Sequence, residues 1–202
     1  MSCFGRVIGV IIILVAIGFI VMYSGAINIG ATEPHSPIAQ YVLSTTMENS
    51  VRYHAKDIQV PPLDNPAMIM EGFRHYREMC VMCHLAPGVK ATEIHKGLRP
   101  EPPELYEGLD EWKPNQLFWI VKHGIKMTGM PAWGPTHSDD KIWAIVAFLE
   151  KLPKMNAAQF REMDRKAGPA GEDEDEHALD HGKVLGRENH AKDPPGGGIH
   201  QT

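Results

Sequence analysis

The sequence predicts an all-α protein, in which a small helical domain is preceded by a single transmembrane helix and followed by a disordered tail. Three observations predict this class. An uncharged apolar run occupies residues 7–23, apolar side chains recur at helical spacing between residues 65 and 153, and large apolar side chains are almost absent after residue 166. We therefore divide the chain into an anchor (1–30), a linker (31–64), a helical domain (65–153) and an acidic, His-containing tail (154–202).

The anchor is expected to be a retained membrane helix. Residues 7–23 span roughly 26 Å as a helix at about 1.5 Å per residue, and weaker apolar residues continue to Ile29, enough to cross a bilayer core of about 30 Å. The alternative is a cleaved signal peptide with its cleavage site at residues 24–26, but the run is long for a signal. Arg6 precedes the run and the next basic residue is Arg52, which predicts a cytoplasmic N-terminus and an external domain.

The linker and the tail differ from the domain in composition. The linker mixes Pro, Ser, Thr and charged residues, and we expect a short helix near residues 47–56, ended by Pro61 and Pro62. The alternative to a flexible linker is a segment that packs on the domain or on a partner. The tail begins with a short amphipathic stretch (156–166) and then becomes acidic and rich in Gly and Pro, a composition typical of disorder.

The first helix of the domain is predicted over residues 66–79. Ile69, Phe73 and Tyr76 recur at the spacing of one helical face, which Cys80 continues. Glycine in the middle of a helix costs about 1 kcal/mol relative to alanine. Gly72 therefore indicates a close crossing with another helix.

Two further helices complete the predicted domain. One covers residues 114–123, with Pro114 suited to its first turn and Gly124 to its C-terminal stop. The other begins at Ser138, a favourable N-cap residue, and Pro153 ends its apolar pattern. Three helices with ordered Pro- and Gly-rich loops are enough to enclose one cofactor.

Residues 80–84 form a C-x-x-C-H motif, the attachment signature of c-type haem. Two thiols three positions apart near a helix end can each add to one vinyl group of a porphyrin. The adjacent His84 can then bind the iron. A redox dithiol or half of a zinc site would also use C-x-x-C, but a zinc site would require a second cysteine pair, and the chain has 3 cysteines in all.

A candidate for the sixth iron ligand lies in the loop at residues 124–134. Met130 precedes Pro131, which fixes the backbone beside the sulfur, in a segment punctuated by Gly and Pro. Met127 is the competing candidate. Core packing is the ordinary role of methionine, and the Gly-Met-Pro context favours Met130 as the ligand.

With these motifs, residues 66–153 resemble class I cytochromes c, and especially the membrane-anchored bacterial monohaem forms that combine C-x-x-C-H with a T-G-M-P-A-[WF]-G loop. The resemblance implies one covalently bound haem c. It implies thioether bonds from Cys80 and Cys83 and axial ligation by His84 and Met130. It also implies that the carbonyl of Pro103 accepts a hydrogen bond from His84 Nδ1. Leu85 departs from the family, in which many members carry Gly after the histidine.

The resemblance implies a one-electron carrier and not an enzyme. Its expected location is the bacterial inner membrane, single-pass, with the haem domain in the periplasm, and its partners are redox proteins of a membrane electron-transfer chain. The alternative is a fixed cytochrome c subunit of a larger respiratory or dehydrogenase complex. A haem enzyme or gas sensor would require an open sixth position. The formal net charge of −5 argues against a nucleic-acid partner, and the absence of both G-x-x-x-x-G-K-[ST] and G-x-G-x-x-G argues against a nucleotide enzyme. We expect no small-molecule substrate.

Overall fold

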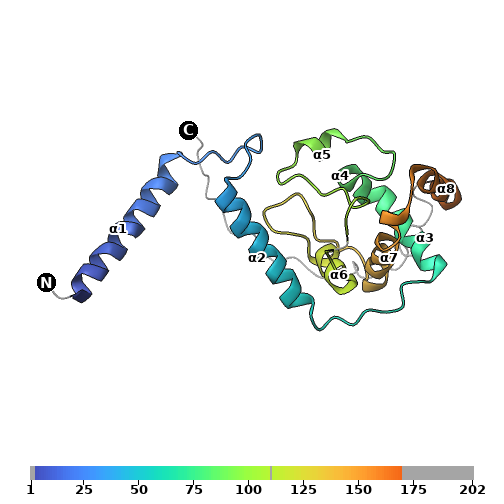
Figure 1. Ribbon diagram of the computed structural model, residues 1–202, viewed down its shortest axis with the longest axis horizontal. Helices are drawn as coiled ribbons and strands as arrows, with labels where there is room; N and C mark the ends of the chain where they lie inside the picture. Colours follow the sequence, from blue (N-terminus) through green and yellow to red (C-terminus); the bar gives the residue numbers. More distant parts are fainter. Residues whose placement is uncertain (1–2, 110, 170–202) are drawn as a thin grey trace, which may run out of the picture. The chain divides into compact units, whose positions relative to one another are not determined.

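The computed structural model describes residues 3–109 and 111–169, and within these residues the secondary structure is helical, without strands (Figure 1). This confirms the all-α class. The elements follow in the order α1 (Cys3–Ser24), α2 (Pro37–Ala55), α3 (Pro66–His75), η1 (Tyr76–Cys80), α4 (Val81–His84), α5 (Glu93–Gly97), α6 (Pro114–His123), α7 (Asp139–Leu149), η2 (Leu152–Lys154) and α8 (Ala157–Ala167).

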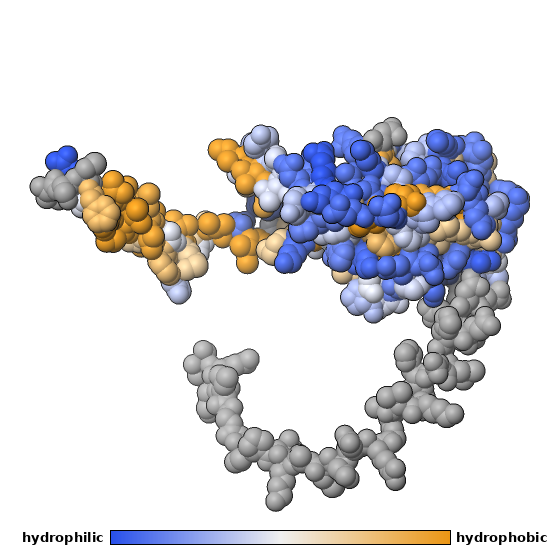
Figure 2. Space-filling model, turned by 90° about the horizontal axis from the view of Figure 1, so that it is seen from below, coloured by the Kyte–Doolittle hydropathy of each residue, from blue (hydrophilic) through white to orange (hydrophobic). Residues whose placement is uncertain are grey.

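Helix α1 is apolar and exposed along its length. Its residues Phe4–Ser24 have a mean hydropathy of 2.8 and none of them is buried, so the helix meets the length and hydropathy of a membrane span, as a signal sequence also would. Figure 2 shows the contrast between the apolar surface of α1 and the largely hydrophilic surface over the domain. Such an exposed apolar rod is stable in lipid and unfavourable in water.

Helices α3 and α7 cross closely at Gly72. A Cβ atom on Gly72 would lie 1.8 Å from the carbonyl oxygen of Ala144, so no side chain larger than hydrogen fits between the two backbones. This confirms the predicted close crossing. The N-cap of α3 is Asn65, whose side chain accepts from the backbone N–H of Ala67, and Ser138 caps α7 by accepting from Lys141 N–H.

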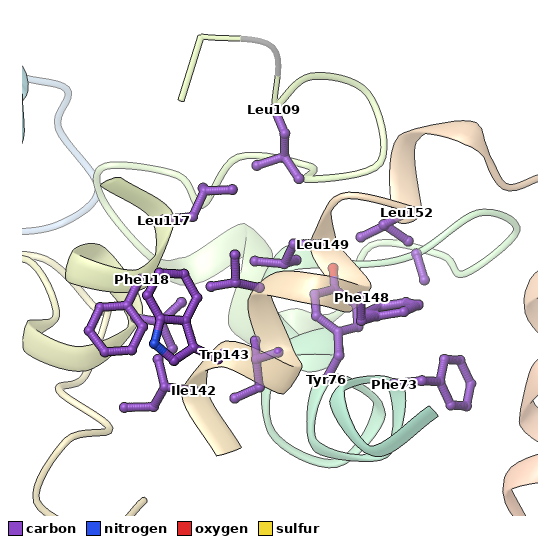
Figure 3. Close-up of a cluster of buried hydrophobic side chains, with 14 of the residues drawn as sticks. Phe73, Tyr76, Leu109, Leu117, Phe118, Ile142, Trp143, Phe148, Leu149 and Leu152 are labelled. Carbon is purple, nitrogen blue, oxygen red and sulfur yellow. The ribbon is translucent and has the colours of Figure 1, made fainter. Parts of the chain in front are cut away.

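The core consists of aromatic and branched side chains from α3, η1, α6 and α7 (Figure 3). Phe73, Tyr76 and Phe148 are completely buried, and the centroid of the Phe148 ring lies 5.3 Å from that of Phe73 and 5.2 Å from that of Tyr76. Phe118 stacks on Trp143 at 4.2 Å. Edge-to-face and stacked rings of this kind stabilise a core beyond the area that they bury. The core therefore fixes the end of η1, from which the C-x-x-C-H segment continues.

Helix α2 departs from the expected linker. It runs from Pro37 to Ala55, longer than the short helix expected near residues 47–56, and its C-terminal half packs on α6. Val51 and Ala55 are buried, and the side-chain amide of Asn115 donates to the carbonyl of Ala55 at 2.7 Å. The physical reason is spacing, because Met47, Val51 and Ala55 recur every four residues on one helical face.

Helix α8 lies beyond the boundary expected after residue 153. Phe160 is 7% exposed and its ring lies 5.2 Å from that of Phe73, and Arg77 pairs with Asp164 at 3.2 Å. The amphipathic stretch assigned to the tail is thus a helix packed on α3, because its apolar face supplies Phe160 to the core. The tail predicted to be disordered lies, from residue 170 onward, outside the described residues.

Candidate functional site

The C-x-x-C-H segment lies at the end of one continuous helical path. Helix α3 passes into the π-helical segment η1, and α4 ends the path at His84. A π-helical turn holds one more residue than an α-helical turn and is frequent at functional sites. This widening allows Phe73 and Tyr76 to stay in the core while Cys80 lines a cavity beside it.

A cavity of about 420 Å³ lies among α2, η1, α4, α6, the C-terminal end of α7 and the loop residues 98–109, 112 and 125–133. This volume falls in the range of about 300–1,000 Å³ that is usual for small-molecule and cofactor pockets. Cys80, Cys83, His84 and Met130 all line it, and so does Pro103. The remaining lining is predominantly apolar, with Leu, Ile, Val, Pro and Trp side chains. The structure therefore brings every predicted site residue to one cavity.

His84 is oriented through its ring nitrogen Nδ1, which lies 2.9 Å from the carbonyl oxygen of Pro103. Because a carbonyl oxygen can only accept, Nδ1 carries the hydrogen, and the lone pair of the neutral ring is on Nε2. Burial lowers the pKa of His84, against a smaller upward effect of the Pro103 hydrogen bond. A neutral imidazole of fixed tautomer is the form that binds a metal ion.

Met130 and Met127 occupy different surroundings in the loop after α6. Met130 is partly buried and lines the cavity, and its backbone N–H donates to Thr128 Oγ1 at 3.1 Å. The Thr128 hydroxyl donates in turn to the carbonyl of Ile125 at 2.7 Å. Met127 is 95% exposed and does not line the cavity. The geometry thus favours Met130 over Met127 as the ligand.

The thiols of Cys80 and Cys83 are partly buried, and both have a raised pKa. Burial raises the pKa of Cys80 to about 12, with a further upward effect of Cys83, and burial also raises the pKa of Cys83. Catalytic and redox dithiols show the reverse, a lowered pKa that maintains a thiolate. The raised pKa values keep both thiols protonated, the opposite of the thiolate that a redox dithiol maintains.

The donor set fits a haem c. One cavity presents two neutral thiols, one neutral imidazole and one thioether, and its walls are otherwise apolar. Histidine with methionine is a ligand pair of c-type cytochromes, and apolar walls exclude water from the porphyrin. Harder cations such as Mg²⁺ or Ca²⁺ prefer oxygen ligands, which this cavity does not supply from the side chains named.

Two groups of site residues were missed by the sequence prediction. Met47 of α2 lines the cavity, although it lies in the segment expected to be a linker. Its four-residue spacing to Val51 was the available signal. Thr92 and His95 bind the backbone of the C-x-x-C-H segment, and the N-cap pattern at Thr92 was the available signal for the short helix α5. The sequence around His95 gave no signal for the contact of its side chain with the Cys83 carbonyl.

Comparison with known families identifies a match over the middle of the chain. Residues 67–149 match the family model described as cytochrome c oxidase, cbb3-type, subunit III. The matched stretch covers less than half of the chain and contains the C-x-x-C-H motif, Pro103 and Met130. No curated protein matches the chain.

Proposed function

Since residues 67–149 match a cytochrome c family model, which is consistent with a class I cytochrome c domain, we propose that the chain is a monohaem carrier that transfers one electron at a time. Cys80 and Cys83 hold the haem by thioether bonds, and His84 and Met130 bind its iron. The chain performs no bond chemistry on a small-molecule substrate.

One observation carries the proposal: both cysteines, the histidine and Met130 line a single apolar cavity of cofactor size. When bound, a haem c supplies a ferrous/ferric couple that takes up and releases single electrons. The residues of this chain tune that couple. The thioether of Met130 and the apolar walls favour the ferrous state, and the Pro103 carbonyl holds His84 in one tautomer.

Helix α1 supports a second part of the proposal, a tethered carrier. An exposed apolar helix of this length anchors the chain in a membrane, and the charge distribution predicts a cytoplasmic N-terminus. The haem domain then stands in the periplasm of a bacterial inner membrane. Tethering keeps it at high effective concentration near membrane-bound redox proteins.

The test is the visible spectrum of the purified full-length protein, oxidised and reduced, with and without carbon monoxide. We expect a low-spin spectrum, a weak far-red band from the sulfur–ferric-iron bond and no carbon monoxide binding. High-spin iron or ready carbon monoxide binding would mean an open sixth position, and the carrier would give way to a haem enzyme or gas sensor.

A fixed subunit of a larger respiratory complex is the second candidate. The description of the matched family, subunit III of a cbb3-type cytochrome c oxidase, favours it. Purification in mild detergent separates the two functions. A stoichiometric partner that survives a salt wash would support the subunit, and a single species with the mass of one haem-loaded chain would support the carrier.

A further inference from the structure

His95 is a buried polar side chain that the proposed ligand set does not use. It is 2% exposed, and it lies on the short helix α5. Its ring nitrogen Nδ1 lies 2.7 Å from the carbonyl oxygen of Cys83, and its Nε2 lies 3.0 Å from Oε1 of Glu101. A buried ring that is satisfied at both nitrogens is fixed in place, so its hydrogen-bond chemistry can be deduced from its partners.

Both partners of the His95 ring are acceptors. The Cys83 carbonyl oxygen can only accept, so Nδ1 carries a hydrogen. A neutral ring with its hydrogen on Nδ1 would then direct the Nε2 lone pair at the carboxylate of Glu101, and two acceptors would meet at 3.0 Å. The contact is favourable only when the pair holds one more proton, either as an imidazolium with a carboxylate or as a neutral ring with a carboxylic acid.

Helix α5, which carries His95, also binds the backbone carbonyl that precedes that of Cys83. The Thr92 hydroxyl donates to the carbonyl of Met82, and it accepts from the backbone N–H of His95 at 3.0 Å. Helix α5 therefore holds two successive carbonyls at the C-terminal end of the C-x-x-C-H helix, where helical carbonyls lack intrahelical partners. Glu101, at the other end of the pair, lies two residues before Pro103, whose carbonyl accepts from His84.

Arg99 does not replace His95 as the cationic partner of the Glu101 carboxylate. Its guanidinium donates to the carbonyls of Lys96 and Leu98. Among the described residues, the ion pair of the Glu101 carboxylate is with His95, whose side chain is 3% exposed while that of Glu101 is 59% exposed. The proton between His95 and Glu101 is therefore covered by the buried His95 ring on the side that faces the C-x-x-C-H helix.

We infer that His95 and Glu101 form a proton-sharing, net-neutral pair, and that His95 is a positioning residue that connects the end of the C-x-x-C-H helix to the loop carrying Pro103. This inference rests on the proposed haem function only for its electrochemical readout. The pair keeps an unpaired negative charge away from the iron ligand His84 and fixes both backbone segments that surround that ligand.

Three variants of the full-length haem protein test the charge of the pair by its reduction potential, at one pH and low ionic strength, where exposed charges are least screened. The side chain of His95→Asn retains a donor for the Cys83 carbonyl but leaves Glu101 as a lone carboxylate. A negative charge near the haem stabilises ferric iron, so we expect a lower potential. Glu101→Gln keeps the pair neutral and should leave the potential unchanged. The double variant should return the potential of His95→Asn to the wild-type value.

The opposite pattern would overturn the inference. If the pair held no extra proton, it would carry one negative charge, so Glu101→Gln would raise the potential and His95→Asn would leave it unchanged. This comparison needs no absolute reduction potential. A net-neutral pair predicts a change only in His95→Asn, and a negatively charged pair predicts a change only in Glu101→Gln.

A second measurement does not depend on the variants folding. In ferrous, ¹⁵N-histidine-labelled full-length protein, nitrogen NMR should show the His95 ring protonated at both nitrogens, or at Nδ1 with Nε2 bonded to an acid proton. An Nε2 signal that shows neither a bonded proton nor a hydrogen bond to an acid proton would contradict the proton-sharing pair. Absence of a reduced haem spectrum in the same sample would sink the carrier proposal instead, and the ring signals would still report on His95.

Discussion

The loop at residues 124–134 places two methionines three positions apart in different surroundings. Met130 lines the cavity, and Met127, with a φ of 61°, is 95% exposed. The sequence favoured Met130 as the ligand because of its Gly-Met-Pro context, with Met127 as the competing candidate. The difference lies in the hydrogen bonds of Thr128, which fold the loop so that only the second sulfur meets the cavity.

Met130→Ala should lower the reduction potential, on the order of 0.1 V within the about 0.8 V that axial ligands span, and should open the iron to carbon monoxide. The measurements are a redox titration and a carbon monoxide difference spectrum. Met127→Ala is the matched control and should change neither. An unchanged spectrum in Met130→Ala would remove this residue from the ligand role.

Leu85, the residue after the histidine, combines backbone strain with burial. Its φ of 56° and ψ of −170° lie in a region that is almost exclusive to glycine, yet its side chain is 1% exposed. The Leu85 carbonyl also accepts a hydrogen bond from the buried hydroxyl of Tyr76 at 2.6 Å. Such strain costs about 1–3 kcal/mol, and loss of a buried leucine side chain costs about 3–5 kcal/mol.

Leu85→Gly should therefore destabilise this protein by about 2 kcal/mol, because the lost burial exceeds the relieved strain. Denaturant unfolding followed by circular dichroism measures the change. A gain in the free energy of unfolding would mean that the strain term is the larger one at this position.

At the scale of elements, the crossing of α3 and α7 depends on one missing side chain. Gly72→Ala would put a methyl group 1.8 Å from the backbone oxygen of Ala144, and a backbone cannot rotate aside as a side chain can. We expect a loss of about 3 kcal/mol or more in the free energy of unfolding. Gly97→Ala, with no atom within 4 Å of the new Cβ, is the control and should leave stability unchanged or slightly higher. Equal melting curves for the two variants would contradict the close crossing.

Helix α2 offers the same kind of comparison within one element. Val51→Asp places a charge at a position that is 1% exposed, whereas Val42→Asp places it at one that is 53% exposed. We expect Val51→Asp to release α2 from α6, with a loss of about 3 kcal/mol and faster tryptic cleavage after Arg52 and Lys56. Val42→Asp should match the wild type. Equal cleavage rates in both variants would mean that the docking of α2 contributes little.

The sequence predicted the elements better than their boundaries. The three domain helices were predictable because each combines an apolar face with a terminal signal, as at Pro114 and Ser138. The sequence predicted α2 too short and assigned α8 to the tail. Both helices have weakly apolar sequences and are stabilised by the helices on which they pack, which the local pattern does not show. The motif residues of the site were readable one by one, but the contact of His95 with Cys83 joins the two short helices α4 and α5 and has no local signal.

At the scale of the whole molecule, retention of α1 decides where the domain works. We expect the protein in the membrane fraction after washes with high salt and alkaline carbonate, with an intact mass that includes residues 1–30 and one haem. Replacement of residues 1–30 by a cleavable signal should give a periplasmic protein with an unchanged spectrum. A soluble wild-type protein that begins near residue 27 would show a cleaved signal instead.

The docking of α2 also sets how far the domain stands from the bilayer. With α1 in the membrane, the non-helical chain between α1 and α2 is residues 25–36, which extends to at most about 40 Å, whereas the whole stretch 25–65 between α1 and α3 would extend to about 140 Å. The volume that the domain explores is smaller by roughly fortyfold, as the cube of these lengths. A short tether selects redox partners by the distance of their docking faces from the membrane. Partners whose docking faces lie close to the bilayer surface are contacted often, and partners whose docking faces lie beyond the reach of the tether are not contacted.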